Sequence, residues 1–277
     1  MGSFLNLVSD RLIKGESIII GRSHCDFCKK PLRIKNLIPV FSFLVQKARC
    51  SFCKKKLSWF YPFSEILTGL LLVAAVNYSG VFVSHNIRNI WDFAFLAVIF
   101  ASFIIMFLTD AKYSLLCDSV SNLGIGAIII FVLGGQAIYL LSLYQKLAID
   151  SMGIYLLKVG YWNLQLSSTL QSLAYTIVSA LVITLFFYLL VKLTKGKGMG
   201  EGDIKLGLII GLFNGFPYNF IAIFLGFLYG SIYSLTAVAL RKKTLKDHVP
   251  FGPFLLLGSV TALLWGGIIL NWYVDLF

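Results

Sequence analysis

Residues 91–109 read WDFAFLAVIFASFIIMFLT, an apolar stretch that contains one charged residue, Asp92, and is followed by Asp110. A helix needs about 20 apolar residues to cross a bilayer, so this stretch predicts a transmembrane helix. Working outward, similar stretches occur at Phe63–Val83, Ser119–Leu143, Gln171–Leu193, Asn219–Leu240 and Gly252–Val274. A shorter one, Ile204–Phe216, predicts a seventh span that ends in the Asn214–Pro217 turn.

The composition excludes an ordinary soluble domain. Hydrophobic residues make up 58% of the chain, charged residues 13%, and the mean hydropathy is +0.85. Soluble domains have roughly 45–50% apolar and about 25% charged residues. We therefore expect an all-α, polytopic transmembrane helix bundle of about seven spans over residues 63–277. Residues 1–62 are expected to form a small polar module that precedes it.

The basic residues predict the orientation of the bundle. With seven alternating spans, 21 of the 24 lysines and arginines fall on the side that holds residues 1–62, 110–118, 192–205 and 241–251. The positive-inside rule makes this side cytoplasmic. Residues 10–62 and 241–251 should thus face the cytoplasm and 146–168 the outside. The net charge of +12 is first a signal of this topology and second a source of attraction to anionic lipid, and it predicts no nucleic-acid partner.

Two CxxC pairs in the polar module predict a metal site. Cys25 and Cys28 are separated by 21 residues from Cys50 and Cys53. Two such pairs typically close a tetrahedral four-sulfur zinc site, and a module this small needs a metal to stabilise it. The alternatives are two disulfides, which a cytoplasmic position disfavours, or four free thiols. All four ligands would be protein thiolates, so the zinc is expected to be structural, with His24 a bystander.

Three carboxylates lie near the predicted cytoplasmic ends of helices: Asp110, Asp118 and Asp203. Carboxylates at membrane depth are costly and are usually functional. Asp203 ends a Gly200-Glu201-Gly202-Asp203 motif, in which the glycines allow an unusual backbone path. The alternative for Asp118 and Asp203 is that each caps the N-terminus of a helix.

Two aspartates brought together can hydrolyse a peptide bond. One keeps a proton, and the other acts as a base that activates water. The three histidines, His24, His85 and His248, are scattered in the chain, which disfavours a serine–histidine mechanism.

Motifs along almost the whole chain resemble those of the type IV prepilin peptidases, bacterial membrane members of the GxGD aspartic peptidases. They are Gly2-Ser3-Phe4-Leu5-Asn6, Arg11, Ser23-His24-Cys25, Pro39, Ser42, the later CxxC pair, Tyr61-Pro62, Glu65, the Asp110–Asp118 loop, Gly200–Leu206 and Pro250-Phe251-Gly252-Pro253-Phe254. Members of this family usually begin with a membrane helix before the Gly2–Asn6 motif, whereas Met1 precedes it here.

The resemblance implies an activity. Such enzymes cut a short basic leader from prepilins and pseudopilins of pili, secretion or competence systems, after a glycine. Many also methylate the new N-terminus with S-adenosylmethionine.

The resemblance also implies roles for individual residues. It makes Asp118 and Asp203 the catalytic pair, with Cys117 in place of a usual proline. Asp110, Gly200, Gly202 and Lys205 are supporting residues. Glu201 is a candidate attractor for leader lysines, or else a solvated loop charge. The alternative function is a non-catalytic zinc-module scaffold of a secretion or DNA-uptake apparatus.

Overall fold

The computed structural model describes residues 1–18, 23–25, 27–32, 38–84, 86–196, 199–241, 244 and 249–276. The helices are α1 (Gly2–Lys14), α2 (Phe41–Val45), α3 (Phe60–Ser79), α4 (Ile87–Tyr113), α5 (Asp118–Ile149), α6 (Ser151–Lys158), α7 (Tyr161–Leu193), α8 (Gly202–Asn214), α9 (Tyr218–Ala239) and α10 (Gly252–Val274). Within these residues there is no strand, which confirms the predicted all-α class.

Six helices are long and apolar enough to cross a membrane: α3, α4, α5, α7, α9 and α10. They confirm the six long predicted spans. The short seventh stretch forms α8, which has 13 residues. At 1.5 Å per residue, α8 is only about 20 Å long, less than the roughly 30 Å of hydrocarbon. It lies against α5, α7, α9 and α10, so it is enclosed by protein along its length.

Small residues let α8 and α10 approach their neighbours closely. A Cβ atom added at Gly211 of α8 would lie 2.7 Å from the Cα atom of Ala180 in α7. One added at Gly226 of α9 would lie 3.0 Å from the Cα atom of Leu255 in α10. Close backbone packing of this kind drives helix association in lipid, where the hydrophobic effect between helices is absent. The glycines therefore set how closely α8 packs on α7 and α9 on α10.

Two asparagines, Asn219, which is buried, and Asn214, which is half-buried, hold the turn between α8 and α9. Asn219 Nδ2 donates to Ser179 Oγ of α7 at 2.7 Å, and Asn214 Nδ2 donates to Ser259 Oγ of α10 at 2.6 Å. Hydrogen bonds between helices limit sliding in an apolar medium. They anchor one end of α8, while the Gly-x-Gly-Asp motif stands at the other.

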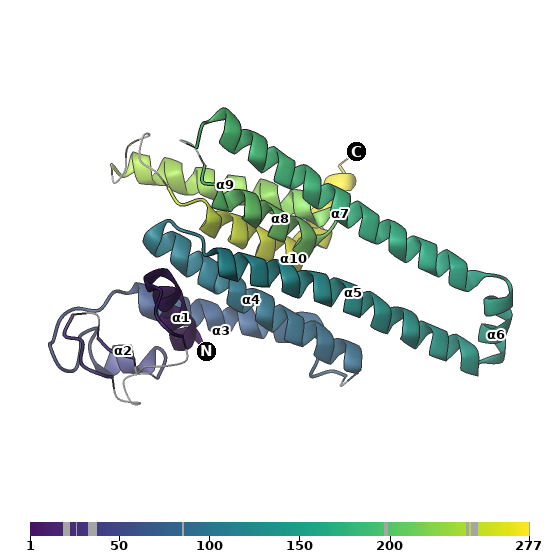
Figure 1. The fold of residues 1–277 in the computed structure, drawn as a ribbon, viewed down its shortest axis with the longest axis horizontal. Helices are drawn as coiled ribbons and strands as arrows, with labels where there is room; N and C mark the ends of the chain where they lie inside the picture. Colours follow the sequence, from purple (N-terminus) through teal and green to yellow (C-terminus); the bar gives the residue numbers. More distant parts are fainter. Residues whose placement is uncertain are drawn as a thin grey trace.

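The segments predicted to share the cytoplasmic side lie at one end of the bundle. Figure 1 shows the cysteine module, the α4–α5 turn and the starts of α8 and α10 at the left, with α6 at the far right. The predicted cytoplasmic loop 241–251 is described only at 241, 244 and 249–251, and His85 and His248 also lie outside the described residues.

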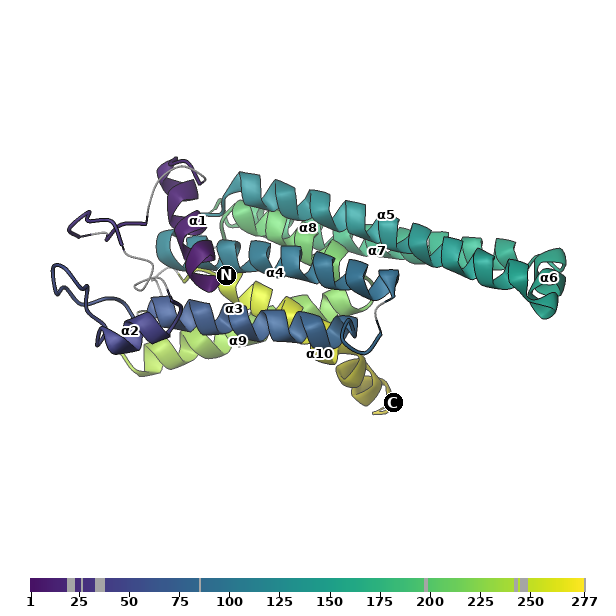
Figure 2. The same cartoon turned by 90° about the horizontal axis from the view of Figure 1, so that it is seen from below.

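The outer loop predicted at 146–168 is instead largely helical. Helices α5 and α7 have 32 and 33 residues and extend well past the predicted limits of 143 and 171. Lys146 and the polar residues of 161–171 lower the hydropathy there, but they do not interrupt helical backbone. Figure 2 shows the resulting α5–α6–α7 hairpin projecting beyond the rest of the bundle.

Candidate active site and metal site

The two CxxC pairs form matching turns that face each other. Cys25 and Cys50 each begin a turn closed by a short antiparallel bridge, His24 with Pro31 and Arg49 with Lys56. Each turn also stacks a lysine on the aromatic ring of the other turn. Lys55 Nζ lies 4.1 Å from the ring centroid of Phe27, and Lys30 Nζ lies 5.7 Å from that of Phe52. This reciprocal contact brings the four thiols together.

The four cysteines are arranged to hold one metal ion. The Sγ atoms of Cys25, Cys28, Cys50 and Cys53 all lie within 4.8 Å of one another, and those of Cys25 and Cys53 are 4.0 Å apart. Tetrahedral zinc with bonds of about 2.3 Å needs sulfur atoms roughly 3.8 Å apart, so the cluster has the right size. Backbone N–H groups of Cys53 and Phe52 lower the pKa of the Cys50 thiol to about 7, whereas desolvation and the neighbouring thiols raise the pKa of Cys53, so Cys50 is the more readily ionised of the two ligands that a metal requires as thiolates.

Helix α1 joins this module to the bundle, a contact that the predicted division at 62/63 does not anticipate. A Cβ atom at Gly2 would lie 2.7 Å from the Cα atom of Glu65, so only glycine lets α1 approach α3 this closely. Asn6 Nδ2 donates to Ser64 Oγ at 2.7 Å. Asp10 Oδ1 accepts hydrogen bonds from Lys112 Nζ at 3.0 Å and Tyr113 Oη at 3.1 Å, at the end of α4.

Asp203 is a buried carboxylate in the first turn of α8. Its residue is 8% exposed, and its Oδ2 accepts the backbone N–H of Gly200 at 3.2 Å. The N-cap of α8 is Glu201, so Asp203 is not the capping residue that the alternative interpretation required. The Gly-x-Gly-Asp motif thus folds back to hold the carboxylate inside the protein.

Asp110 lies beside Asp203. It is in the last part of α4, is also 8% exposed, and its negative charge acts on the Asp203 carboxylate. Its Oδ2 abuts the start of α10, where a Cβ atom added at Gly252 would lie only 2.6 Å away. The glycine of the Pro250–Phe254 motif therefore leaves the space that the Asp110 carboxylate occupies. The sequence identified both motifs, but it did not show that they meet.

Asp118 has a different environment. It is the first residue of α5, its side chain is 76% exposed, and its Oδ1 accepts a hydrogen bond from Lys205 Nζ at 2.6 Å. Cys117 is the N-cap of α5, so Asp118 is not a capping residue either. The ion pair joins the start of α5 to α8, and Gly202 packs against Leu116 nearby.

The structure therefore pairs the three aspartates in a way that the sequence did not predict. Asp110 and Asp203 form a buried carboxylate pair, while Asp118 is bound to Lys205 at the surface. Two buried carboxylates that interact cannot both ionise easily. One carboxylate that can accept a proton beside one that can donate it is the arrangement that acid–base hydrolysis needs.

Comparison with known proteins identifies the family of the chain. Residues 1–78 match the bacterial peptidase A24 N-terminal domain, and residues 97–235 match the type IV leader peptidase family. A relative from Bacillus subtilis (strain 168), a prepilin leader peptidase/N-methyltransferase, is 30% identical over all of this chain and 94% of its own length. Relatives of the same name from Aeromonas salmonicida (strain A449) and Legionella pneumophila are 30% and 28% identical, covering 94% and 93% of this chain and 76% and 77% of their own lengths. No solved structure matches.

The protein belongs to the type IV leader peptidase family, as the family model and the relatives show. It is an enzyme, a multi-pass membrane peptidase.

Proposed function

We propose that this enzyme removes the leader peptide of type IV prepilins or pseudopilins and then methylates the new N-terminal residue with S-adenosylmethionine. The names of the relatives support both activities. The observation that carries the peptidase activity is the buried pair formed by Asp110 and Asp203.

In this proposal the ionised carboxylate of the pair takes a proton from water, which attacks the scissile carbonyl. The protonated carboxylate donates a hydrogen bond to the carbonyl oxygen and later helps to protonate the leaving amine. Asp203 is oriented for this by the Gly200 N–H, and Asp110 by its place against the start of α10. Both groups are shielded from bulk water, which strengthens their action on the substrate.

The pair predicted from the sequence, Asp118 with Asp203, is the second candidate. Its support is that Lys205 brings Asp118 next to the first turns of α8, two residues from Asp203 in the chain. The Asp118 side chain, however, is solvated, and its negative charge is already neutralised by Lys205. We therefore favour Asp110 as the partner and assign Asp118 to the contact between α5 and α8.

The substrate should reach this pair from the lipid. A prepilin carries a basic leader followed by an apolar helix, which would lie against the bundle with the scissile bond at the cytoplasmic interface. The distribution of basic residues supports a cytoplasmic position for this end of the bundle in the inner membrane.

We further propose that the four-cysteine site holds zinc. The set of four thiolates, with sulfur atoms at tetrahedral separations, suits Zn²⁺. Such a site leaves no position for water, so the ion would stabilise the module rather than take part in hydrolysis.

The deciding experiment incubates the purified protein with a prepilin in detergent and records the N-terminal residue and mass of the product. We expect cleavage, and a gain of one methyl group when S-adenosylmethionine is added. Asp110→Asn and Asp203→Asn should each lose nearly all cleavage, and the double variant little more, because groups that act as a unit are non-additive.

The same assay separates the alternatives. Full activity of Asp110→Asn together with loss in Asp118→Asn would instead establish the second pair. A folded wild type that cleaves no prepilin would favour the scaffold function. Membrane insertion of each variant is measured separately, so that misfolding is not mistaken for lost chemistry.

A further inference from the structure

The short helix α2 of the cysteine module turns an apolar face away from the protein. Phe43 is buried and packs edge-on against Trp59, with the two ring centroids 5.0 Å apart. Phe41, Leu44 and Val45 are instead 72%, 58% and 80% exposed. Their spacing of three and four residues places these three side chains on one face of the helix, the outer face of α2. Contiguous apolar side chains that point away from a protein usually mark a surface that another molecule covers.

The outer face of α2 lies at the depth where the bundle enters the membrane. The backbone N–H of Val40, the N-cap of α2, donates to Glu65 Oε2 at 2.7 Å, and Glu65 is in the second turn of the spanning helix α3. At 1.5 Å per residue, this contact is about 8 Å along the helix from the first residue of α3. Figures 1 and 2 both show α2 beside the beginning of α3, at the edge of the bundle. Trp59, just before α3, is 70% exposed, as is typical of tryptophan at the boundary between hydrocarbon and headgroups.

Basic residues stand next to the outer face of α2. A pocket of about 630 Å³ opens beside Val45 and is lined by Lys47, Arg49 and Lys54. All three are exposed, and none forms an ion pair with a residue that the structure describes. The described residues that line this basic pocket include no acidic one. Positive φ angles at Lys47 and Ala48 turn the chain back directly after α2, so the positive charges stay close to the apolar side chains.

An anionic lipid complements both parts of this surface. An amphipathic helix in the membrane interface buries its apolar face about 5–10 Å into the boundary between headgroups and acyl chains, and nearby basic residues attract anionic headgroups. A second copy of the chain would bring two basic pockets together, and like charges across an interface oppose association. A basic leader peptide would be repelled by the pocket for the same reason.

We propose that α2 docks the cysteine module on the adjoining leaflet of the membrane. The outer face of α2 lies among the acyl chains, and Lys47, Arg49 and Lys54 bind the phosphate of an anionic headgroup. The docking surface contains neither the buried aspartates nor the inner wall of the module, so it does not depend on the proposed catalytic activity. It gives the module a contact with lipid in addition to its contacts with α3 and α4.

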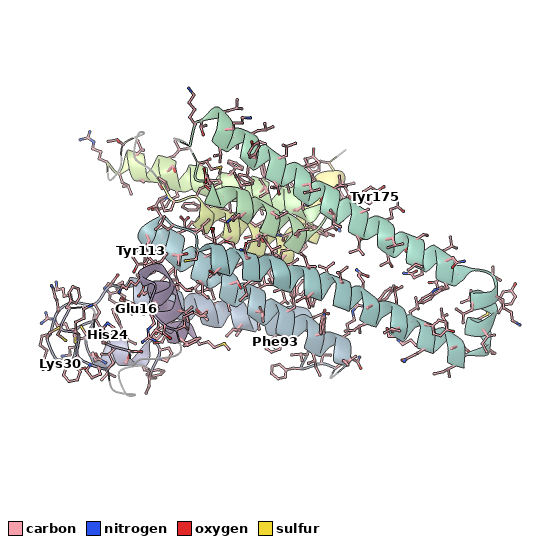
Figure 3. The ribbon with its side chains drawn as sticks, in the orientation of Figure 1. Glu16, His24, Lys30, Phe93, Tyr113 and Tyr175 are labelled. Atoms are coloured by element: carbon pink, nitrogen blue, oxygen red, sulfur yellow. The ribbon has the colours of Figure 1, made fainter. Side chains whose placement is uncertain are left out.

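Tryptophan fluorescence of the full-length protein in lipid vesicles tests the inference. Leu44→Trp adds one tryptophan to the five of the wild type, and the difference between the two spectra is the emission of the new residue. In vesicles of phosphatidylglycerol and phosphatidylcholine, lipids brominated near the top of the acyl chain should quench this emission by about half or more, because bromine quenches by contact and the residue lies at that depth. Lys30→Trp is the control. Figure 3 shows Lys30 at the tip of the module, away from the bundle, so its emission should remain unquenched.

The same reporter tests the basic pocket. At equal lipid content, the quenching constant of Leu44→Trp should be about threefold larger with brominated phosphatidylglycerol than with brominated phosphatidylcholine, because the pocket attracts the anionic lipid. Adding Lys47→Glu/Lys54→Glu should abolish the difference. The matched control, Lys29→Glu/Lys195→Glu, removes the same charge from exposed lysines outside the pocket and should preserve it. Melting temperatures of all variants are compared with that of the wild type.

Two results would overturn the docking on lipid. One is an emission of Leu44→Trp that no brominated lipid quenches and that matches Lys30→Trp. The other is a blue-shifted emission that stays unquenched, which would mean that protein, such as a second copy, covers α2. Equal quenching by the two lipids would overturn the assignment of the pocket to an anionic headgroup. If Leu44→Trp does not fold, Val45→Trp reports on the same face from the most exposed position of α2.

Discussion

Replacing Gly252 by alanine tests whether the Asp110 carboxylate must stay where the structure places it. The new Cβ atom would lie 2.6 Å from Asp110 Oδ2 and 3.1 Å from Leu206 Cδ1. Ordinary contacts begin at 3.4 Å, so Asp110 or the start of α10 must move by about 0.8 Å. Alanine itself is compatible with helical backbone and removes the entropic cost of glycine, so the fold should be retained.

The expected effect is on activity rather than stability. A misplacement of about 1 Å in a catalytic group can lower a rate by on the order of 10²-fold. We therefore expect Gly252→Ala to lower kcat/KM for prepilin cleavage by about 10- to 100-fold, with a melting temperature near that of wild type. The double variant Gly252→Ala/Asp110→Asn should be no worse than Asp110→Asn, because both changes act on the same carboxylate.

Gly126→Ala is the matched control for this substitution. Gly126 lies inside α5, and a Cβ atom added there meets no atom within 4 Å. Its cleavage rate should remain within about twofold of wild type. Unchanged kcat/KM in Gly252→Ala would contradict the reasoning, since it would show that cleavage does not depend on the position of the Asp110 carboxylate.

The remaining predictions concern the metal and the orientation. Purified, reduced protein should contain one zinc per chain, and Cys50→Ser should lose it and melt at lower temperature, because a structural metal contributes folding energy; metal-free wild type would exclude the site. In intact cells, Lys158→Cys should react with an impermeant thiol reagent, and Lys195→Cys only after permeabilisation. The opposite pattern would invert the topology.

Much of the bundle could be predicted because lipid restricts the backbone structure and the composition of any segment that crosses it. Spanning segments must be helical and apolar over a fixed length, so hydropathy alone located the six long helices. Hydropathy could not show where α5 and α7 end, because helices continue into water without any apolar requirement. The cysteine cluster could be predicted because two CxxC pairs have few ways to place four thiolates together.

The pairing of the aspartates could not be predicted because it depends on the packing of distant segments. Asp110, Asp118 and Asp203 all stand near helix ends on one side, and only Asp203 carries a distinguishing Gly-x-Gly-Asp motif, so the sequence does not show which aspartate is its partner. What distinguishes them is burial, which is set by the contact of Asp110 with the start of α10 and of Asp118 with Lys205. Gly252 makes room for the contact between Asp110 and α10, but this role can be recognised only from a structure in which α10 lies beside α4.

A charge swap separates the two roles open to Asp118. If its carboxylate serves only to hold α5 against α8 through Lys205, then Asp118→Lys and Lys205→Glu should each lower cleavage by placing like charges together. The swapped double variant restores an opposite pair and should recover most of the activity. An exposed ion pair contributes about 0–1 kcal/mol, so none of the three variants should unfold. If the Asp118 carboxylate itself attacks or activates water, moving it to position 205 cannot restore cleavage, and an inactive, folded double variant would make Asp118 the catalytic partner of Asp203.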